Sequence, residues 1–301
     1  MWWIVQKVFK VSAEQNVERS PYEKEFDDMG YVVVPEALSA DHVARLNDVL
    51  DELTRHDSTR IHNVADILRL SNEFVDMIDL PTVLPKIQKL LGNNIWVNHT
   101  HYNVNPPQTE YNESGSTFDF GWHRDGGVIN EDVPPPAPLL SLKVGFYLTD
   151  LSDLGRGQTY VIGGSHKTGE KKPSREMLPD TATPLCVGPG TAVIYDRRLI
   201  HSIRSENNSD ITRRAIFIQY AFRWLAAVDA MTVQHLRGTC SPTRLQLLGL
   251  SSSYNEFDGA AGRSGLYYPR AEDTPLAGNI PSKMTKIIDS VRRRIKRYLF
   301  S

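Results

Sequence analysis

The spacing of apolar residues changes from helical to strand-like near residue 95, and this change limits the folds open to the chain. Before it, residues 40–56 place apolar side chains three and four positions apart, which predicts an amphipathic helix capped by Ser39 or Asp41. A second helix is predicted over residues 82–91, with a glycine directly after it as the stop signal. After the change, β-branched and aromatic residues fall in short runs bounded by Gly, Pro, Asn and Asp.

Short strands are predicted for most of the chain beyond that point. One strand, 31–34, precedes the helices, and the others are predicted over 95–102, 141–149, 158–162, 184–187, 191–195, 199–204 and 213–222. Helices followed by many short strands are typical of a β-barrel or jelly roll with N-terminal helical support, whereas a doubly wound fold alternates strands and helices. The sequence therefore predicts a mainly β fold with flanking α-helices.

Charge is distributed unevenly along the chain. The 34 basic and 36 acidic residues give a net charge of −2, which argues against a general nucleic-acid-binding protein. Residues 282–301 hold seven basic residues and one acidic residue, so they carry +6 and residues 1–281 carry −8. Their apolar residues recur at helical spacing, which predicts a basic amphipathic helix. This helix either docks on the domain or contacts an anionic membrane, and the sequence leaves both alternatives open.

The N-terminus and the cysteines bear on localisation. Residues 1–9 are apolar and aromatic but too short to span a bilayer, and no run in the chain approaches eighteen apolar residues. This segment either covers a core or lies at a membrane interface. Cys186 and Cys240 cannot make a disulfide scaffold and favour a reducing compartment. We therefore expect a cytoplasmic protein, with peripheral membrane contact through the termini as an open alternative and no prediction of oligomeric state.

One short run, Phe120-Gly121-Trp122-His123-Arg124-Asp125, carries candidate metal ligands. In a strand, residues two apart share a face, so His123 and Asp125 are able to hold one ion together. An imidazole and a carboxylate, completed by a second histidine, form the ligand set of non-haem Fe(II) oxygenases. A single H-x-D sequence is weak evidence alone.

A later pair of strands supplies the remaining candidates. His201 follows the turn-like Gly188-Pro189-Gly190 and is the expected third ligand. The polar run 205–210 then returns the chain through Arg213, near the start of the next strand. A guanidinium at this position suits bidentate pairing with a bound dicarboxylate. Taken singly, each of these candidate residues is better explained by a structural role. Their order and spacing along the chain, taken together, favour a metal site with a bound dicarboxylate.

The ordered set of motifs resembles the phytanoyl-CoA dioxygenase family over about residues 22–225. The matching motifs are Trp122-His123-x-Asp125, Gly157-x-x-x-Val161-Ile162-Gly163-Gly164-Ser165-His166, Pro189-Gly190-Thr191, His201 and Arg213-Arg214-Ala215-Ile216. The family often has Pro-Gly-Ser-His where this chain has Gly163-Gly164-Ser165-His166; we expect this turn to be structural.

The resemblance implies an enzyme with a double-stranded β-helix (jelly-roll, cupin-like) core that uses Fe(II), 2-oxoglutarate and O2. It implies that His123, Asp125 and His201 bind the iron and that Arg213 holds the distal carboxylate of 2-oxoglutarate. Arg214 lies on the opposite strand face, so one of the two arginines alone fits this role. Retention of Asp125 counts against a halogenase, in which that carboxylate is replaced by a small residue.

Further residues are expected around the site. His101, Asn103, Lys143 and Thr149 are assigned to co-substrate binding, and Phe120, Trp122, Tyr147 and Trp224 to a partly apolar substrate pocket. The alternative for Lys143 is a solvent-facing edge position. His99 and His101 are two residues apart and form a second, weaker candidate pair of metal ligands. A role as pocket-lining or hydrogen-bonded residues is favoured for both.

The predicted function is oxidation of an unactivated C–H bond of a small organic substrate by a single catalytic domain, 1–301. Within it we distinguish residues 22–225 as helical support and core, 226–281 as an extension, and 282–301 as the basic helix. The acidic body offers no obvious basic groove for an acyl-CoA, so a secondary metabolite, a lipid-like molecule or an amino-acid derivative is expected. The long loops 105–120 and 128–140, with residues 226–270, are expected to shape that choice. Alternatives are an oxidative cyclase or desaturase with the same iron site, a zinc hydrolase, and a non-catalytic jelly roll with a vestigial site.

Overall fold

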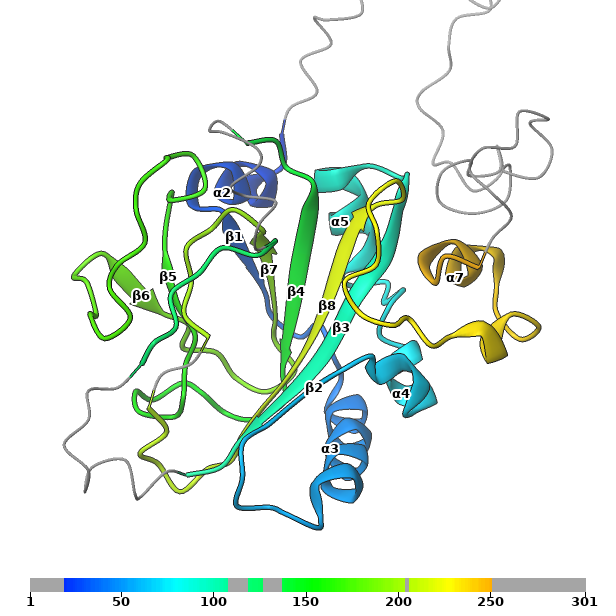
Figure 1. Cartoon of the computed structure of the whole chain (residues 1–301), viewed down its shortest axis with the longest axis horizontal. Coiled ribbons are helices and arrows are strands. Elements are labelled where there is room, and N and C mark those ends of the chain that lie inside the picture. The colour runs from blue at the N-terminus through cyan, green and yellow to red at the C-terminus, as the bar shows by residue number, and fades with distance from the viewer. Residues whose placement is uncertain (1–18, 108–118, 127–136, 204–205, 251–301) are drawn as a thin grey trace, which may run out of the picture.

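The computed structural model describes residues 19–107, 119–126, 137–203 and 206–250, and its centre is a six-stranded antiparallel sheet (Figure 1). The strands lie in the order β1 (Tyr31–Val34), β7 (Ala192–Asp196), β4 (Ser141–Tyr147), β8 (Arg213–Phe222), β3 (Ile95–Asn105) and β2 (His62–Ala65). Strands distant in sequence are therefore neighbours, which is the crossed connectivity of a jelly roll rather than of a meander.

A second, smaller layer faces the large sheet. It contains the hairpin of β5 (Tyr160–Ile162) and β6 (Ala182–Pro184), with the segments around His123 and His201 beside it as isolated bridges. In the described residues these two sheets remain separate, so the jelly roll is open rather than closed into a barrel. The predicted fold class, mainly β with flanking helices around a jelly-roll core, is confirmed.

The helices pack mainly on the face of the large sheet opposite the small layer, except that α2 lies beside β1 and its C-terminal end contacts the loop that follows β5 (Figure 1). They are α2 (Pro21–Met29), α3 (Ala40–Thr54), η1 (Ile67–Arg69), α4 (Asn72–Val75), α5 (Leu84–Leu91), η2 (Gln234–Leu236) and α7 (Pro242–Leu247). The cap of α3 is Ser39, whose hydroxyl accepts a hydrogen bond from the backbone N–H of His42, and α5 ends at Gly92 in a positive-φ conformation. The largest apolar core lies between these helices and the sheet.

Strand alternation sorts the residues of the sheet into two sets. On β4, Leu142, Val144 and Phe146 join the core under the helices. Tyr147 joins a second apolar cluster with residues of the small layer. Lys143 lies four residues before Tyr147 on the same strand, so its side chain is on the same face, where it lines a cavity. The face away from the helices therefore carries the candidate site residues.

The predicted strand boundaries differ from the structure at several places. The strand predicted over 199–204 is absent, because in this segment only His201 pairs, through single bridges to His123 and Val161. The segment holding Asp125 is likewise a turn rather than a strand. Strand β3 runs on to Asn105, past the predicted end, and a bulge between Val97 and His99 resets its alternation.

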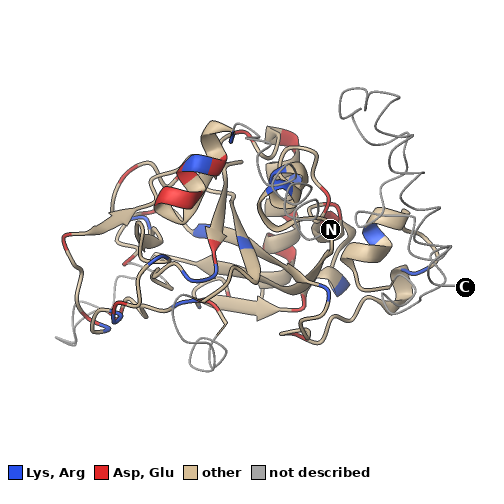
Figure 2. Cartoon of the chain, turned by 90° about the horizontal axis from the view of Figure 1, so that it is seen from above, with Lys and Arg blue, Asp and Glu red and all other residues tan. Residues whose placement is uncertain are grey.

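Several predictions concern residues outside the described part of the chain. The N-terminal segment 1–9 and the basic helix 282–301 lie outside it, as do most of the loops 105–120 and 128–140. Among the described residues, none of the helices has the length and apolar character needed to cross a membrane. In the view of Figure 2, Lys and Arg are interspersed with Asp and Glu along the described elements.

Gly145, on β4, leaves the space that the rings of Phe217 and Tyr195 occupy beside the cavity. A Cβ atom built there meets the ring of Phe217 at 2.8 Å and that of Tyr195 at 3.3 Å. We expect Gly145→Ala to displace the Phe217 ring and to lower the free energy of unfolding by about 1–3 kcal/mol, the usual cost of overpacking. Urea unfolding measures this; Gly188→Ala is the matched control, because a Cβ there has no neighbour within 4 Å. Equal stability of the two variants contradicts the prediction.

Candidate metal centre

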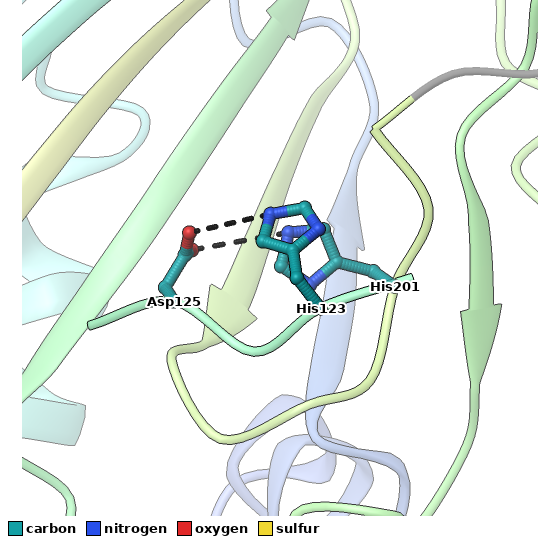
Figure 3. Close-up of side chains that lie close together, drawn as sticks. All are labelled: His123, Asp125 and His201. Atoms are coloured by element: carbon teal, nitrogen blue, oxygen red, sulfur yellow. Dashed lines mark ion pairs between the residues drawn. The ribbon is translucent and has the colours of Figure 1, made fainter. Parts of the chain in front are cut away.

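Three predicted ligands, His123, Asp125 and His201, converge in the space between the two layers (Figure 3). Their ligand atoms all lie within 4.8 Å of one another. The Nε2 atom of His123 is 3.8 Å from Oδ1 of Asp125, and the Nε2 atom of His201 is 3.9 Å from Oδ2 of the same carboxylate. These three side chains are the only such cluster of histidine, cysteine and acidic residues among the residues described.

The backbone fixes the two histidines relative to each other. The N–H of each donates to the carbonyl of the other, at 3.0 Å in both directions, so they form a two-residue antiparallel bridge. Their rings lie 4.2 Å apart, centroid to centroid. This bridge explains how residues 78 positions apart in sequence meet without a regular strand at either place.

Both imidazoles are held in the tautomer that suits metal binding. The Nδ1 atom of His123 lies 3.0 Å from the Gly121 carbonyl, and that of His201 lies 3.0 Å from the Leu199 carbonyl. A carbonyl only accepts, so each Nδ1–H donates and each Nε2 keeps its lone pair, directed toward Asp125. Two imidazole nitrogens and a carboxylate oxygen are the donor set that non-haem Fe(II) sites use.

Electrostatics favour the metal-binding protonation states. Burial, reinforced by the neighbouring His201, lowers the pKa of His123 to about 3, and burial also lowers the pKa of His201. For Asp125, burial alone would raise the pKa, but Lys143 and the two histidines outweigh it and hold the pKa below its usual value. Neutral imidazoles and an ionised carboxylate are therefore the forms present near neutral pH.

Arg213 is a buried cation beside this cluster. Its guanidinium donates to Oδ1 of Asn103 at 2.5 Å and to Oγ1 of Thr159 at 3.2 Å, and lies over the ring of Tyr147. Its side chain is 1% exposed, and burial lowers its pKa. No carboxylate of the described residues forms an ion pair with it. A buried guanidinium with neutral partners alone favours an anionic ligand as its counter-ion.

A cavity of about 230 Å³ extends along the interior face of the large sheet beside these groups. It is lined by Asn63, His101, Asn103, His123, Lys143, Thr159, Tyr195, His201, Ser202, Ile203 and Phe217. Lys143 lies on the central strand β4 and donates to Oδ1 of Asp125 at 2.5 Å, so the solvent-facing edge alternative is wrong. His101 and Asn103 line the cavity, as expected for pocket residues, and Tyr147 lies behind it against Arg213 and Tyr195.

Two predicted site residues lie elsewhere. The hydroxyl of Thr149 accepts a hydrogen bond from the backbone N–H of Arg214 and does not line the cavity, because β4 ends at Tyr147 and the alternation stops there. Trp224 is 54% exposed, stacks on Phe222, and follows the end of β8 opposite Arg213. Trp224 does not line this cavity, and its assignment to the substrate pocket stays a prediction.

Phe120 and Trp122 serve mainly as packing. They stack on each other and join Ile162 and Ile200 in a small core, and the indole N–H of Trp122 donates to the Met177 carbonyl. Trp122 also contributes to a groove next to the cavity, described below. The rings of the weaker candidate pair, His99 and His101, lie 5.0 Å apart, and His99 Nδ1 lies 3.3 Å from Oδ2 of Asp229. Among the described residues, this pair does not belong to a metal-ligand cluster of three or more groups.

Sequence reasoning missed six residues that line the cavity: Asn63, Thr159, Tyr195, Ser202, Ile203 and Phe217. Tyr195 and Phe217 lie on the interior face because they pair across the sheet with Lys143 and Gly145, respectively. The available signal was alternation: Phe217 lies four residues after Arg213 on the same strand. Thr159 comes from the loop before β5, and no local pattern marks it.

Known proteins share both the sequence pattern and the fold. The family described as "Phytanoyl-CoA dioxygenase (PhyH)" matches residues 26–215. Dioxygenase af480 of Aspergillus fumigatus is 29% identical over 182 residues, 58% of this chain and 54% of that protein. The ectoine dioxygenase of Streptomyces avermitilis is 25% identical over 157 residues, 48% of this chain and 50% of that protein. The chain thus spans about half the length of the curated relatives it matches.

Solved structures support the fold. The epimerase SnoN, in complex with Fe3+, alpha ketoglutarate and nogalamycin RO, has a TM-score of 0.52 to this chain at 19% identity. The match covers 66% of this chain and 82% of SnoN. At this identity the likeness extends to the jelly-roll fold.

Proposed function

The chain belongs to the phytanoyl-CoA dioxygenase family, and we propose that it is an Fe(II)/2-oxoglutarate-dependent dioxygenase that oxidises an unactivated C–H bond of a small organic substrate. The observation that carries this proposal is a single cavity whose wall includes His123 and His201 of the metal cluster as well as Asn103 and Thr159, the hydrogen-bond partners of the buried Arg213. A metal alone would account for the cluster, but it would leave the guanidinium without an anionic partner.

The residues of the site have separate tasks in this proposal. His123 and His201 would bind Fe(II) through Nε2, and Asp125 through its carboxylate. Arg213, oriented by Asn103 and Thr159, would pair with the distal carboxylate of 2-oxoglutarate. Lys143 lies against Asp125 on the cavity wall, where its ammonium would attract the other end of the same dianion.

The chemistry that iron and 2-oxoglutarate supply in such a site is oxidative. One molecule each of 2-oxoglutarate, O2 and R–H gives succinate, CO2 and R–OH, so all atoms are accounted for. Phe217, Tyr195 and Ile203 give the cavity an apolar wall, which limits water around the reacting carbon. We propose a secondary metabolite, a lipid-like molecule or an amino-acid derivative as the substrate, and desaturation or ring closure as alternative outcomes at the same centre.

Two alternative functions would not require all of these residues. A zinc hydrolase would need the three ligands but not Arg213. A non-catalytic jelly roll would have no need to keep the three ligands, Arg213 and the cavity together. Both leave a buried cation unexplained, and so the dioxygenase is favoured.

The proposal is tested by coupled consumption of O2 and 2-oxoglutarate. Protein loaded with Fe(II) without air is expected to convert 2-oxoglutarate to succinate once O2 is admitted, slowly alone and faster with a true substrate from a panel. His201→Ala is the control and should form no succinate above the rate of free Fe(II). Absence of both 2-oxoglutarate binding and succinate formation across the panel overturns the proposal.

A further inference from the structure

A second hollow, a groove of about 630 Å³, adjoins the cavity of the proposed active site. The two share His123 and Ile203 in their walls. The groove is lined by Gly121, Trp122, His123, Arg124, Gly169, Glu170, Lys171, Lys172, Pro173, Arg175 and Ile203. Its volume lies in the range of pockets that hold small molecules.

The metal cluster is more open on the groove side. The side chain of His123 is 31% exposed, whereas those of Asp125 and His201 are 7% and 8% exposed. Ile203 packs over Gly121, where a Cβ would meet its Cδ1 at 2.7 Å, and lines both the groove and the cavity. A substrate lying in the groove would therefore reach the centre past His123 and Ile203, while 2-oxoglutarate fills the inner cavity toward Arg213.

The groove is basic, which corrects the expectation that the acidic body offers no such surface. Arg124 is committed to backbone carbonyls, including that of Arg198, and Arg175 pairs with Asp119. Lys171 and Lys172, in contrast, make no ion pair or hydrogen bond with any described residue. Glu170 is the one acidic residue in the lining, and its carboxylate accepts a hydrogen bond from Thr168.

We infer that the substrate carries an anionic group, a carboxylate or a phosphate, that binds between Lys171 and Lys172 in this groove. Trp122, Pro173 and Ile203 would then contact an apolar part of the substrate that leads from the anionic group to the metal centre. This inference rests on the proposed function, because it assigns the groove to the substrate of that centre. It adds the substrate class, an amphipathic anion, within a body that otherwise repels anions at long range.

Matched probes test the inference without a known substrate. Anaerobic protein with Fe(II) and saturating 2-oxoglutarate is titrated with 1-naphthaleneacetate, 1-naphthyl phosphate and the neutral 1-naphthaleneacetamide, with binding followed by fluorescence anisotropy. We expect at least one anion to bind about 5-fold tighter than the amide at low salt, with the preference shrinking as salt rises. Comparison of the two anions then identifies which group the groove prefers.

Charge-reversal variants test whether Lys171 and Lys172 cause the preference for anionic probes. K171E/K172E should abolish the preference for anions, while K24E/K89E, with the same change in net charge at exposed positions on α2 and α5, should keep it. Equal affinity for the anions and the amide, or an unchanged preference in K171E/K172E, overturns the inference. Titration of 2-oxoglutarate into the same samples tests the proposed function separately: normal 2-oxoglutarate binding with no anion preference removes the groove assignment alone.

Discussion

Loss of iron binding is the expected result of replacing either histidine of the cluster, in His123→Ala or His201→Ala. A three-ligand centre keeps only two donors in each variant, and even residues that merely orient ligands are worth about 10–100-fold in metal affinity. We therefore expect Fe(II) affinity to fall by more than about 100-fold and succinate formation to disappear. Metal content after anaerobic loading and gel filtration measures the first effect.

The control for this experiment is the other histidine pair. His99 also lies close to a carboxylate, that of Asp229, so His99→Gln removes a comparable imidazole from the same side of the sheet. It should retain about one iron per chain. Each alanine variant leaves one carbonyl without its imidazole donor, at a cost of about 1 kcal/mol, so thermal unfolding of the metal-free proteins should differ little. Full iron content in His201→Ala, or its loss in His99→Gln, contradicts the assignment.

Loss of 2-oxoglutarate binding with iron binding intact is the expected result of Arg213→Met. Truncating one partner of a buried charged pair costs about 2–5 kcal/mol, which corresponds to an affinity lower by about 30-fold or more. Without 2-oxoglutarate the variant should be about as stable as the wild type, because the substitution also removes a buried charge that lacks a carboxylate partner. Calorimetric titration and thermal unfolding with and without 2-oxoglutarate measure both effects.

The neighbouring arginine provides the matched control. Arg214 lies on the opposite face of β8, where its guanidinium donates to Asn47 and to Asp51 at 2.5 Å. Arg214→Met should keep 2-oxoglutarate binding and lose at most about 1 kcal/mol of stability, as expected for a partly exposed ion pair. A purely structural Arg213 would behave in the opposite way, with Arg213→Met strongly destabilised and any remaining folded protein still binding 2-oxoglutarate.

The sequence predicts those parts of the site that depend on the order of motifs along the chain and on the alternation of side chains along a strand. The H-x-D sequence, the later His201 and the face of Arg213 rather than Arg214 all follow from local pattern and from the family resemblance. The reason given for the first of these was wrong in detail, since His123 and Asp125 lie in an irregular segment. Their convergence comes from the bridge between His123 and His201, a non-local contact that no local pattern encodes.

The remaining site residues depend on contacts across the fold. From sequence, Lys143 is an unexplained charge in an apolar strand. The structure places it on a central strand next to Asp125, and this ion pair explains why the charge is tolerated there. Thr149 does not line the cavity, because β4 ends two residues earlier. The basic groove was missed because net charge averages over the whole body, whereas a substrate meets only the few residues that line its path.

The proposed iron site is tested most directly by anomalous X-ray scattering at the iron edge from crystals grown without air with Fe(II) and 2-oxoglutarate. We expect one strong peak within about 2.3 Å of His123 Nε2, His201 Nε2 and an Asp125 oxygen, with density for the dicarboxylate running from that peak to Arg213. A peak elsewhere, for example at His99 and Asp229, or a dicarboxylate bound away from Arg213, would contradict it.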